Sequence, residues 1–193
     1  MAKSKLSPLW ITLIVIGAVV LFTLLWFVGS YNGLVKTQLT VDEKWANVQT
    51  AYQRRADLIP NLVETVKAYS TYEGDVLRDI TNARASINGA KTPAQLQAAD
   101  AQLSSALARL LVVVENYPNL KANENYLSLQ DELAGTENRV KTERDIYNNA
   151  VKAYNTKIRV FPSSIVAGMF GFTQREMFKA EEGAETAPKV NFK

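Results

Sequence analysis

The sequence predicts an all-α protein: an N-terminal single transmembrane helix followed by an up-down antiparallel four-helix bundle with long first and last helices. Residues 9–28 form an apolar run without one charged side chain. From Val41 onward, apolar residues recur at alternating intervals of four and three, which is the period of an amphipathic helix. Start and stop signals then divide the chain into helical segments whose lengths suit pairing with one another.

Length and composition limit the classes of protein to consider. The chain has 193 residues, enough for one domain plus an anchor, and contains neither cysteine nor histidine. Disulfides, thiolate nucleophiles, Cys/His metal sites and imidazole chemistry are therefore excluded. The formal charge is +3 and charges alternate in sign along the chain, which is typical of solvated helix surface. We expect no nucleic-acid partner, no cofactor, no metal, no catalytic residue and no enzymatic activity.

Residues 1–8 form a short flank, and residues 9–28 are predicted to cross the membrane once. A helix of about 20 residues covers roughly 30 Å, the thickness of the hydrocarbon core. Trp10 and Trp26 lie near its two ends, where amphipathic rings favour the headgroup level. A cleaved signal peptide is the alternative, with small residues at 28–30, but its apolar region is usually about 7–15 residues long.

The charges that flank the apolar run indicate its orientation. Lys3, Lys5 and the terminal amine precede it, whereas Lys36 and Lys44 follow. Because basic residues favour the cytoplasmic side, this balance favours an N-terminus in the cytoplasm and a bundle outside it.

The region 31–160 is predicted to form the bundle. Its helices are expected at about 31–70, 75–88, 93–116 and 120–160. Gly29 and Asn32–Gly33 suggest a hinge after the membrane helix, and Pro60 should kink the first bundle helix. A turn near Ser70–Asp75 gives long helices of matching length. The alternative is one unbroken helix from Tyr31 to Ile87.

Apolar stripes define the faces that should pack together. Thr92–Gln95 is a capping box with proline at the first helical position, and Phe161–Pro162 ends the last helix. The stripe of the first half of the chain comprises Val41, Trp45, Val48, Tyr52, Ile59, Leu62, Val66, Tyr69, Val76, Ile80, Ala83 and Ile87. The later stripes comprise Leu96, Ala99, Leu103, Ala106, Leu110 and Val113, then Tyr126, Leu129, Leu133, Val140, Tyr147, Ala150, Tyr154 and Ile158.

Antiparallel pairing of the long helices has two consequences. Arg55, a charge within the apolar stripe, should fall near Glu132 and Glu137, which would neutralise it. The last helix should also return residues 161–178 to the membrane side. This segment is apolar and too short to span, so it either lies in the membrane interface or caps the bundle core. Its candidate interfacial residues are Phe161, Pro162, Ile165, Met169, Phe170 and Phe172. The tail 179–193 should be loosely ordered.

One polar patch on the first helix is a candidate site, and we name it the hallmark patch: Arg54, Arg55, Asp57, Pro60, Asn61 and Glu64. Asp57, Asn61 and Glu64 share one helix face. Intrahelical pairing of Arg54 with Asp57 and of Glu64 with Lys67 is the structural interpretation. Partner binding, and acid–base or metal chemistry on the carboxylates, are the other two. Asn61 could also satisfy carbonyls freed by Pro60.

The sequence resembles the LemA family of bacterial membrane proteins. The matching stretches are Tyr31–Val35, Trp45–Val48, Gln53–Lys67, Tyr154–Asn155, Phe161–Ala167 and Gly171–Phe172. The resemblance implies an N-terminal anchor in the bacterial plasma (inner) membrane and a four-helix bundle of long helices. It implies no reaction and transfers no catalytic residue.

The function that we expect is a non-enzymatic, membrane-anchored scaffold or interaction module that self-associates in the membrane plane. Its partners would be the lipid bilayer, further copies of the chain and other membrane or envelope proteins. A component of a membrane transport or channel assembly is the alternative. The apolar run carries no charge, where a transport pathway normally needs one.

Overall fold

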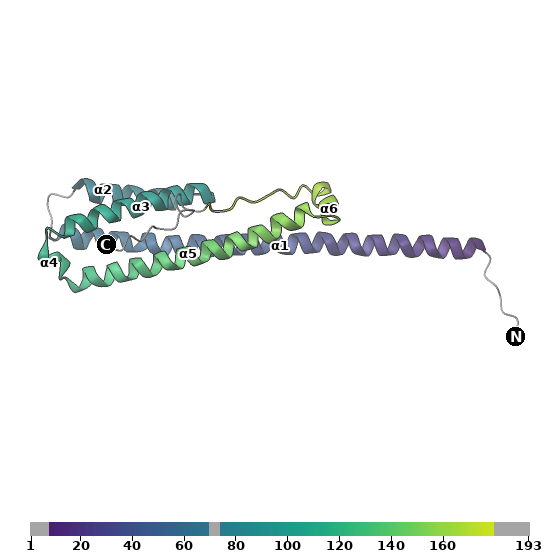
Figure 1. The fold of residues 1–193 in the computed structure, drawn as a ribbon, viewed down its shortest axis with the longest axis horizontal. Coiled ribbons are helices and arrows are strands. Elements are labelled where there is room, and N and C mark those ends of the chain that lie inside the picture. Colours follow the sequence, from purple (N-terminus) through teal and green to yellow (C-terminus); the bar gives the residue numbers. More distant parts are fainter. Residues whose placement is uncertain (1–7, 70–73, 180–193) are drawn as a thin grey trace, which may run out of the picture. The chain divides into compact units, whose positions relative to one another are not determined.

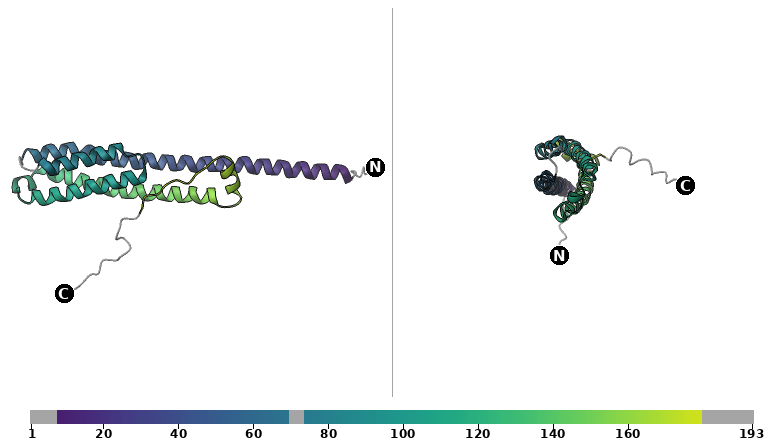
Figure 2. Two further views of the ribbon diagram at one scale, coloured as in Figure 1. Left: turned by 90° about the horizontal axis from the view of Figure 1, so that it is seen from above. Right: turned by 90° about the vertical axis from the view of Figure 1, so that its left-hand side faces the viewer.

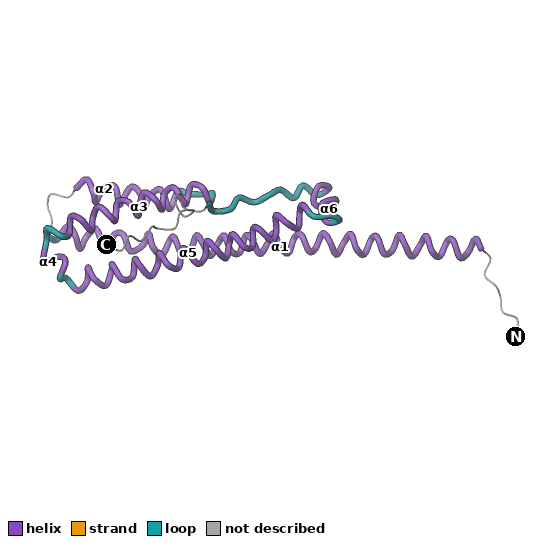
Figure 3. Tube along the Cα trace, in the orientation of Figure 1, coloured by secondary structure: helices purple, strands orange, loops and turns teal. Residues whose placement is uncertain are grey.

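The structure is a computed structural model that describes residues 8–69 and 74–179. Every regular element within these residues is a helix (Figure 1, Figure 3), so the all-helical class is confirmed. The helices are α1 Pro8–Lys67, α2 Gly74–Gly89, α3 Pro93–Val114, α4 Pro118–Lys121, α5 Glu124–Arg159 and α6 Ser163–Met169. Of the predicted tail 179–193, only Lys179 is described, and the other residues lie outside the described part of the chain.

Helix α1 contains the apolar run and continues far beyond it as one helix of 60 residues. Among the described residues it is the one helix long and apolar enough to cross a membrane, with a mean hydropathy of 2.8 in its most apolar window. The hinge expected at Gly29 and Asn32–Gly33 is wrong, because α1 is helical throughout this region. A glycine costs a helix only about 1 kcal/mol. The buried Leu34 and a hydrogen bond to the Gly33 carbonyl help to hold the region in place.

The chain divides into two compact units. Of the described residues, unit 1 contains 8–42 and 152–175, and unit 2 contains 43–69, 74–151 and 176–179. The buried side chains of unit 1 are Leu34, Val41, Tyr154, Ile158, Val166 and Ala167. Two polar contacts join α1 to later residues of this unit: Lys157 Nζ donates to the Gly33 carbonyl at 2.7 Å, and Arg175 pairs with Asp42 at 3.0 Å.

Unit 2 buries apolar stripes from α1, α2, α3 and α5, and α2 lies side by side with α3 (Figure 2). The predicted stripes are largely the buried ones, with shifts of one residue at some positions. The structure buries Leu77, Val114 and Val151 more deeply than the expected Val76, Val113 and Ala150. Tyr69 is exposed, because α1 has already ended at Lys67.

Helix boundaries confirm one local signal and correct two others. Thr92 caps α3, since its hydroxyl accepts from the Gln95 amide at 3.2 Å. The single helix expected from Leu120 is divided into α4 and α5, because the Asn123 side chain accepts from the Tyr126 amide and starts a new helix. One unbroken helix from Tyr31 to Ile87 is also wrong, because α1 ends at Lys67 and α2 begins at Gly74. The predicted turn falls mainly on residues 70–73, which lie outside the described part of the chain.

Candidate functional site

The hallmark patch lies on the part of α1 that belongs to unit 2, and its residues face different ways. Arg54, Asp57, Asn61 and Glu64 are exposed, whereas Arg55 is 2% exposed. No ion pair within the described residues joins Arg54 to Asp57 or Glu64 to Lys67, so the predicted intrahelical pairing is wrong. The patch is therefore one buried arginine beside a set of solvated polar groups.

Arg55 forms the centre of a polar cluster inside unit 2. Its Nη1 pairs with Asp100 of α3 at 2.5 Å, and its Nη2 donates to Ser104 Oγ at 3.3 Å. Glu137 of α5 lies 3.6 Å from Nη2, as the antiparallel register predicted, but Glu132 makes no ion pair with it. Asp100 is the counterion that sequence reasoning missed. It accepts a further hydrogen bond from the Tyr52 hydroxyl at 3.3 Å.

Burial dominates the electrostatics of this cluster. It raises the pKa of the Asp100 carboxyl above its ordinary value of 3.8, although the positive charges of Arg55 and Arg144 oppose the shift. Burial and the neighbouring Asp100 likewise raise the pKa of Tyr52, so its hydroxyl keeps its proton. A hydrogen bond with Lys141 lowers the pKa of the more exposed Glu137. These are the properties of a buried ion pair whose desolvation is costly.

Pro60 has a specific partner in the structure. It lies inside α1 and lacks the N–H that would donate to the carbonyl of Ala56, four residues earlier. Arg84 of α2 supplies the missing donor, with its Nε 3.0 Å from the Ala56 oxygen. The expectation that Asn61 would serve the freed carbonyl at Ala56 is therefore corrected. The proline creates an acceptor that α2 uses to dock on α1.

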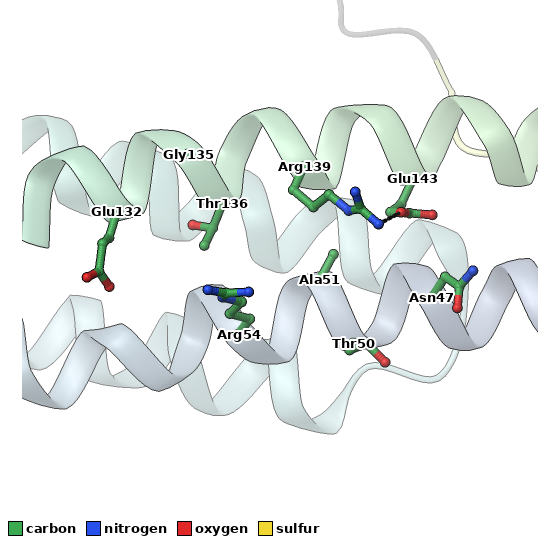
Figure 4. Close-up of a pocket in the computed structure, with 9 residues that line it drawn as sticks. All are labelled: Asn47, Thr50, Ala51, Arg54, Glu132, Gly135, Thr136, Arg139 and Glu143. Atoms are coloured by element: carbon green, nitrogen blue, oxygen red, sulfur yellow. Dashed lines mark ion pairs between the residues drawn. The ribbon is translucent and has the colours of Figure 1, made fainter.

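Arg54 borders a polar groove between α1 and α5, within unit 2. Figure 4 shows its side chain pointing toward α5, beside Glu132 and Thr136. The groove has a volume of about 700 Å³, and Arg139 pairs with the buried Glu143 at 2.6 Å on its α5 side. Both signs of charge line it, which suits a polar contact with another macromolecule more than a single small ion. No group of acidic side chains among the described residues is placed to hold a metal ion.

The last described residues of unit 2, Glu176–Lys179, form an extended strap. Asn148 of α5 donates to the Phe178 carbonyl at 3.1 Å and accepts from the Phe178 amide at 2.9 Å. Gln97 of α3 makes the same pair of hydrogen bonds with Lys179, each at 3.2 Å. Carboxamides can replace a neighbouring strand in this way, because they carry both a donor and an acceptor.

Phe178 anchors the strap and is 5% exposed. Its ring centroid lies 5.6 Å from that of Tyr147 and 6.1 Å from that of Trp45, and the Arg144 guanidinium lies 4.9 Å from it. The aromatic and cation–π contacts surround the ring. The segment 161–178 was expected to act as one unit, but the structure assigns residues up to Arg175 to unit 1 and places the buried Phe178 in unit 2.

The candidate interfacial residues lie in unit 1. The Phe170 ring is 5.8 Å from Phe27 and 4.6 Å from Tyr31, and the Phe172 ring is 6.0 Å from Tyr31. Phe161 and Pro162 precede α6 and are exposed, as are Ile165 and Met169 on the helix itself. On its other face, α6 buries Val166 and Ala167. Sequence reasoning did not predict this division of α6 into a buried and an exposed apolar face.

These observations define a class: an all-helical protein whose first helix carries a candidate membrane span and whose helices are joined by polar side-chain contacts. The family model described as LemA family matches residues 44–192. The chain therefore belongs to the LemA family, and the resemblance stated from its motifs is confirmed.

Individual relatives fit the same family. Magnetosome protein MamQ 2 of Paramagnetospirillum magneticum is 27% identical over 185 residues, covering 81% of this chain and 67% of the relative. Protein LemA of Metamycoplasma hominis is 26% identical over 160 residues, covering 81% and 72%. Magnetosome protein MamQ of Magnetospirillum gryphiswaldense is 24% identical over 182 residues, covering 81% and 67%. A membrane location fits these relatives and the apolar span of α1.

The Pro60–Arg84 relation predicts a coupling between two substitutions. Arg84→Met leaves the Ala56 carbonyl without a donor, and the free energy of unfolding should fall by about 1–3 kcal/mol. Pro60→Ala restores the intrahelical N–H, so the same Arg84→Met change should cost clearly less in that background. Urea unfolding followed by circular dichroism measures both, with the exposed Arg78→Met as control. An equal cost in the two backgrounds would contradict the assignment.

Substitutions of the two adjacent arginines should differ strongly in their effect on the free energy of unfolding. Arg55→Met leaves Asp100 buried without its counterion and should cost about 3–5 kcal/mol at neutral pH, whereas the exposed Arg54→Met should change stability by less than about 0.5 kcal/mol.

The cost of Arg55→Met should also depend on pH. The variant removes the main influence that opposes the raised pKa of Asp100, so its folded state binds that proton more tightly than its unfolded state. The contribution of Asp100 to the stability of the variant should therefore be greatest below pH 3.8 and be lost as the pH rises through the folded-state pKa of Asp100, so the cost relative to the native chain should be smaller at acidic than at neutral pH. Denaturant unfolding at acidic and neutral pH tests this, and a pH-independent cost would contradict it.

Substitutions of two neighbouring residues in the strap should differ sharply in their effect on the free energy of unfolding. Phe178→Ala should lower the free energy of unfolding by about 3–5 kcal/mol, because a buried ring is lost from among Trp45, Tyr147 and Arg144. Met177→Ala, at a partly exposed position next to it, should cost well under half as much. Equal effects of the two substitutions would show that the strap does not depend on its aromatic anchor.

Proposed function

We propose that this protein is a non-enzymatic, membrane-anchored helical scaffold that self-associates in the membrane plane. The observation that carries the proposal is the composition of α1. One helix begins with an apolar run whose large side chains are mostly exposed, Leu9 at 68% and Phe22 at 73%, and continues into unit 2, where it contributes buried core residues. Lipid is the solvent that makes such exposed apolar surface favourable.

We further infer that α1, α2, α3 and α5 form an up-down antiparallel four-helix bundle. Each contributes an apolar stripe to the core of unit 2, and polar contacts connect them in three places. Arg55 of α1 meets α3 and α5, Arg84 of α2 meets α1, and Arg109 of α3 pairs with Asp79 of α2 at 2.8 Å. Charged side chains used in this way position helices, which supports a scaffold.

Self-association in the bilayer requires close approach of two copies of α1. Gly17 lies in the middle of the apolar run, and a Cβ atom placed there would meet nothing within 4 Å. A small residue on an open helix face lets a second backbone come near, and van der Waals packing then favours association. Exposed grooves of unit 2, including the polar one beside Arg54, offer further contact surface.

Lysine-reactive crosslinking in native membranes tests the proposal. We expect dimers or larger species from the full chain, and Gly17→Ile should reduce them several-fold by blocking close packing. Val19→Ile, on a different face of α1, should leave them unchanged. Resistance of the protein to alkaline extraction tests the anchor separately.

Two results would overturn the proposal. A monomer at every protein concentration, with no crosslinked partner, would refute the scaffold. Solute or ion flux through liposomes containing only the purified protein would support the transport or channel component instead.

A further inference from the structure

Unit 1 carries an apolar surface outside the transmembrane run. We name it the α6 face: Phe161, Ile165, Met169 and Phe170. These side chains are 80%, 51%, 67% and 52% exposed. Ile165 and Met169 are four residues apart on α6, the spacing that aligns side chains along one side of a helix. Phe161 and Phe170 lie just before and just after this helix in the chain. Large apolar residues grouped in this way mark a surface that contacts something other than water.

The α6 face lies beside the end of the apolar run. Its Phe170 ring packs 5.8 Å from Phe27, the penultimate residue of the run 9–28, and 4.6 Å from Tyr31 on the next turn of α1. Aromatic rings are enriched at the boundary between hydrocarbon and headgroups. If residues 9–28 cross the bilayer, these contacts hold α6 at that boundary.

The charges of unit 1 are strongly biased. Its described residues include Lys36, Lys152, Lys157, Arg159 and Arg175, against Asp42 as the single acidic side chain. Arg175 pairs with Asp42, and Lys157 donates to a backbone carbonyl, while Lys36 and Arg159 are exposed. An excess of cations beside an apolar surface suits the phosphates of anionic lipids.

We propose that the α6 face lies in the interfacial region of a bilayer that contains anionic lipids. Its apolar side chains contact the upper acyl chains, and Lys36 and Arg159 contact headgroup phosphates. The proposal rests on the membrane anchorage of the proposed function but not on self-association. It also decides between the two interpretations of this segment: Val166 and Ala167 fill the core of unit 1, and the α6 face binds lipid.

The native chain has no cysteine, so a single introduced cysteine can carry an environment-sensitive fluorophore. We would label Met169→Cys in the α6 face and, as a matched control, Val112→Cys, which is 71% exposed on α3 of unit 2. The full chain is reconstituted in phosphatidylcholine vesicles with or without phosphatidylglycerol. Lipids carrying a nitroxide near the headgroup or near the end of the acyl chain then report the depth of the label.

We expect a blue-shifted label at position 169 that is quenched several-fold more by the shallow nitroxide than the label at 112. Phosphatidylglycerol should increase this quenching. Replacing Lys36 and Arg159 by glutamine should reverse that increase, since each cation near an anionic surface shifts the equilibrium about fivefold. Lys91→Gln in unit 2, also an exposed lysine, should have no effect.

Three outcomes would overturn the inference. If the emission of the label at 169 reports an aqueous environment in both lipid compositions, the proposed lipid contact is refuted. A shielded label that neither nitroxide quenches would show that a protein surface covers α6. If phosphatidylglycerol does not change the quenching of the label at 169 by the shallow nitroxide, the proposed role of anionic lipid is refuted. Alkaline extraction of the same vesicles reports the anchor independently, so loss of the α6 contact is distinguishable from failure of the anchor.

Discussion

The structure depends on one constraint: a single helix, α1, carries both an uncovered apolar run and part of a packed core. Residues 9–28 of α1 are apolar on every side, so that stretch needs no partner from its own chain where lipid surrounds it. From Leu34 onward only one stripe is apolar and buried, and the rest of the helix faces water. Helix α1 does not break between these regions, so one helix carries both the candidate membrane span and part of the core surface on which later helices pack.

Two residues of the hallmark patch then determine which helices pack there. Arg55 brings a charge into the core, and burying it is tolerable only if a carboxylate follows, which Asp100 of α3 provides. Pro60 has no N–H, so the Ala56 carbonyl lacks its partner within the helix and accepts a hydrogen bond from Arg84 of α2 instead. Each residue leaves a polar group that a neighbouring helix satisfies, and α5 adds Glu137 to the partners of Arg55. These polar contacts favour one way of packing the apolar helix faces over other ways that would bury a similar apolar area.

Features that depend on local sequence could be predicted, and features that depend on three-dimensional register mostly could not. The apolar run, the buried stripes and the Thr92 cap follow from residues within a few turns of each other. Glu137 was found from antiparallel matching, but Asp100 comes from α3, whose register against α1 no pattern fixes. Phe178 was predicted only as the last residue of the apolar segment 161–178. Its burial depends on Asn148 and Gln97, two ordinary surface residues in the sequence that hold its backbone and that of Lys179.

The two units differ in how their charged side chains are distributed. Unit 2 contains most of the acidic residues and uses opposite charges in pairs, such as Arg109 with Asp79 and Arg139 with Glu143. Such pairs largely cancel and leave a surface suited to polar protein contacts. Unit 1 instead has an excess of cations beside exposed apolar side chains, a combination that proteins use toward anionic membranes. A chain that only needed a tether would require α1 alone. The buried face of α6, the aromatic contacts with Phe27 and Tyr31, and the exposed apolar side chains together are better explained if unit 1 also binds the membrane surface.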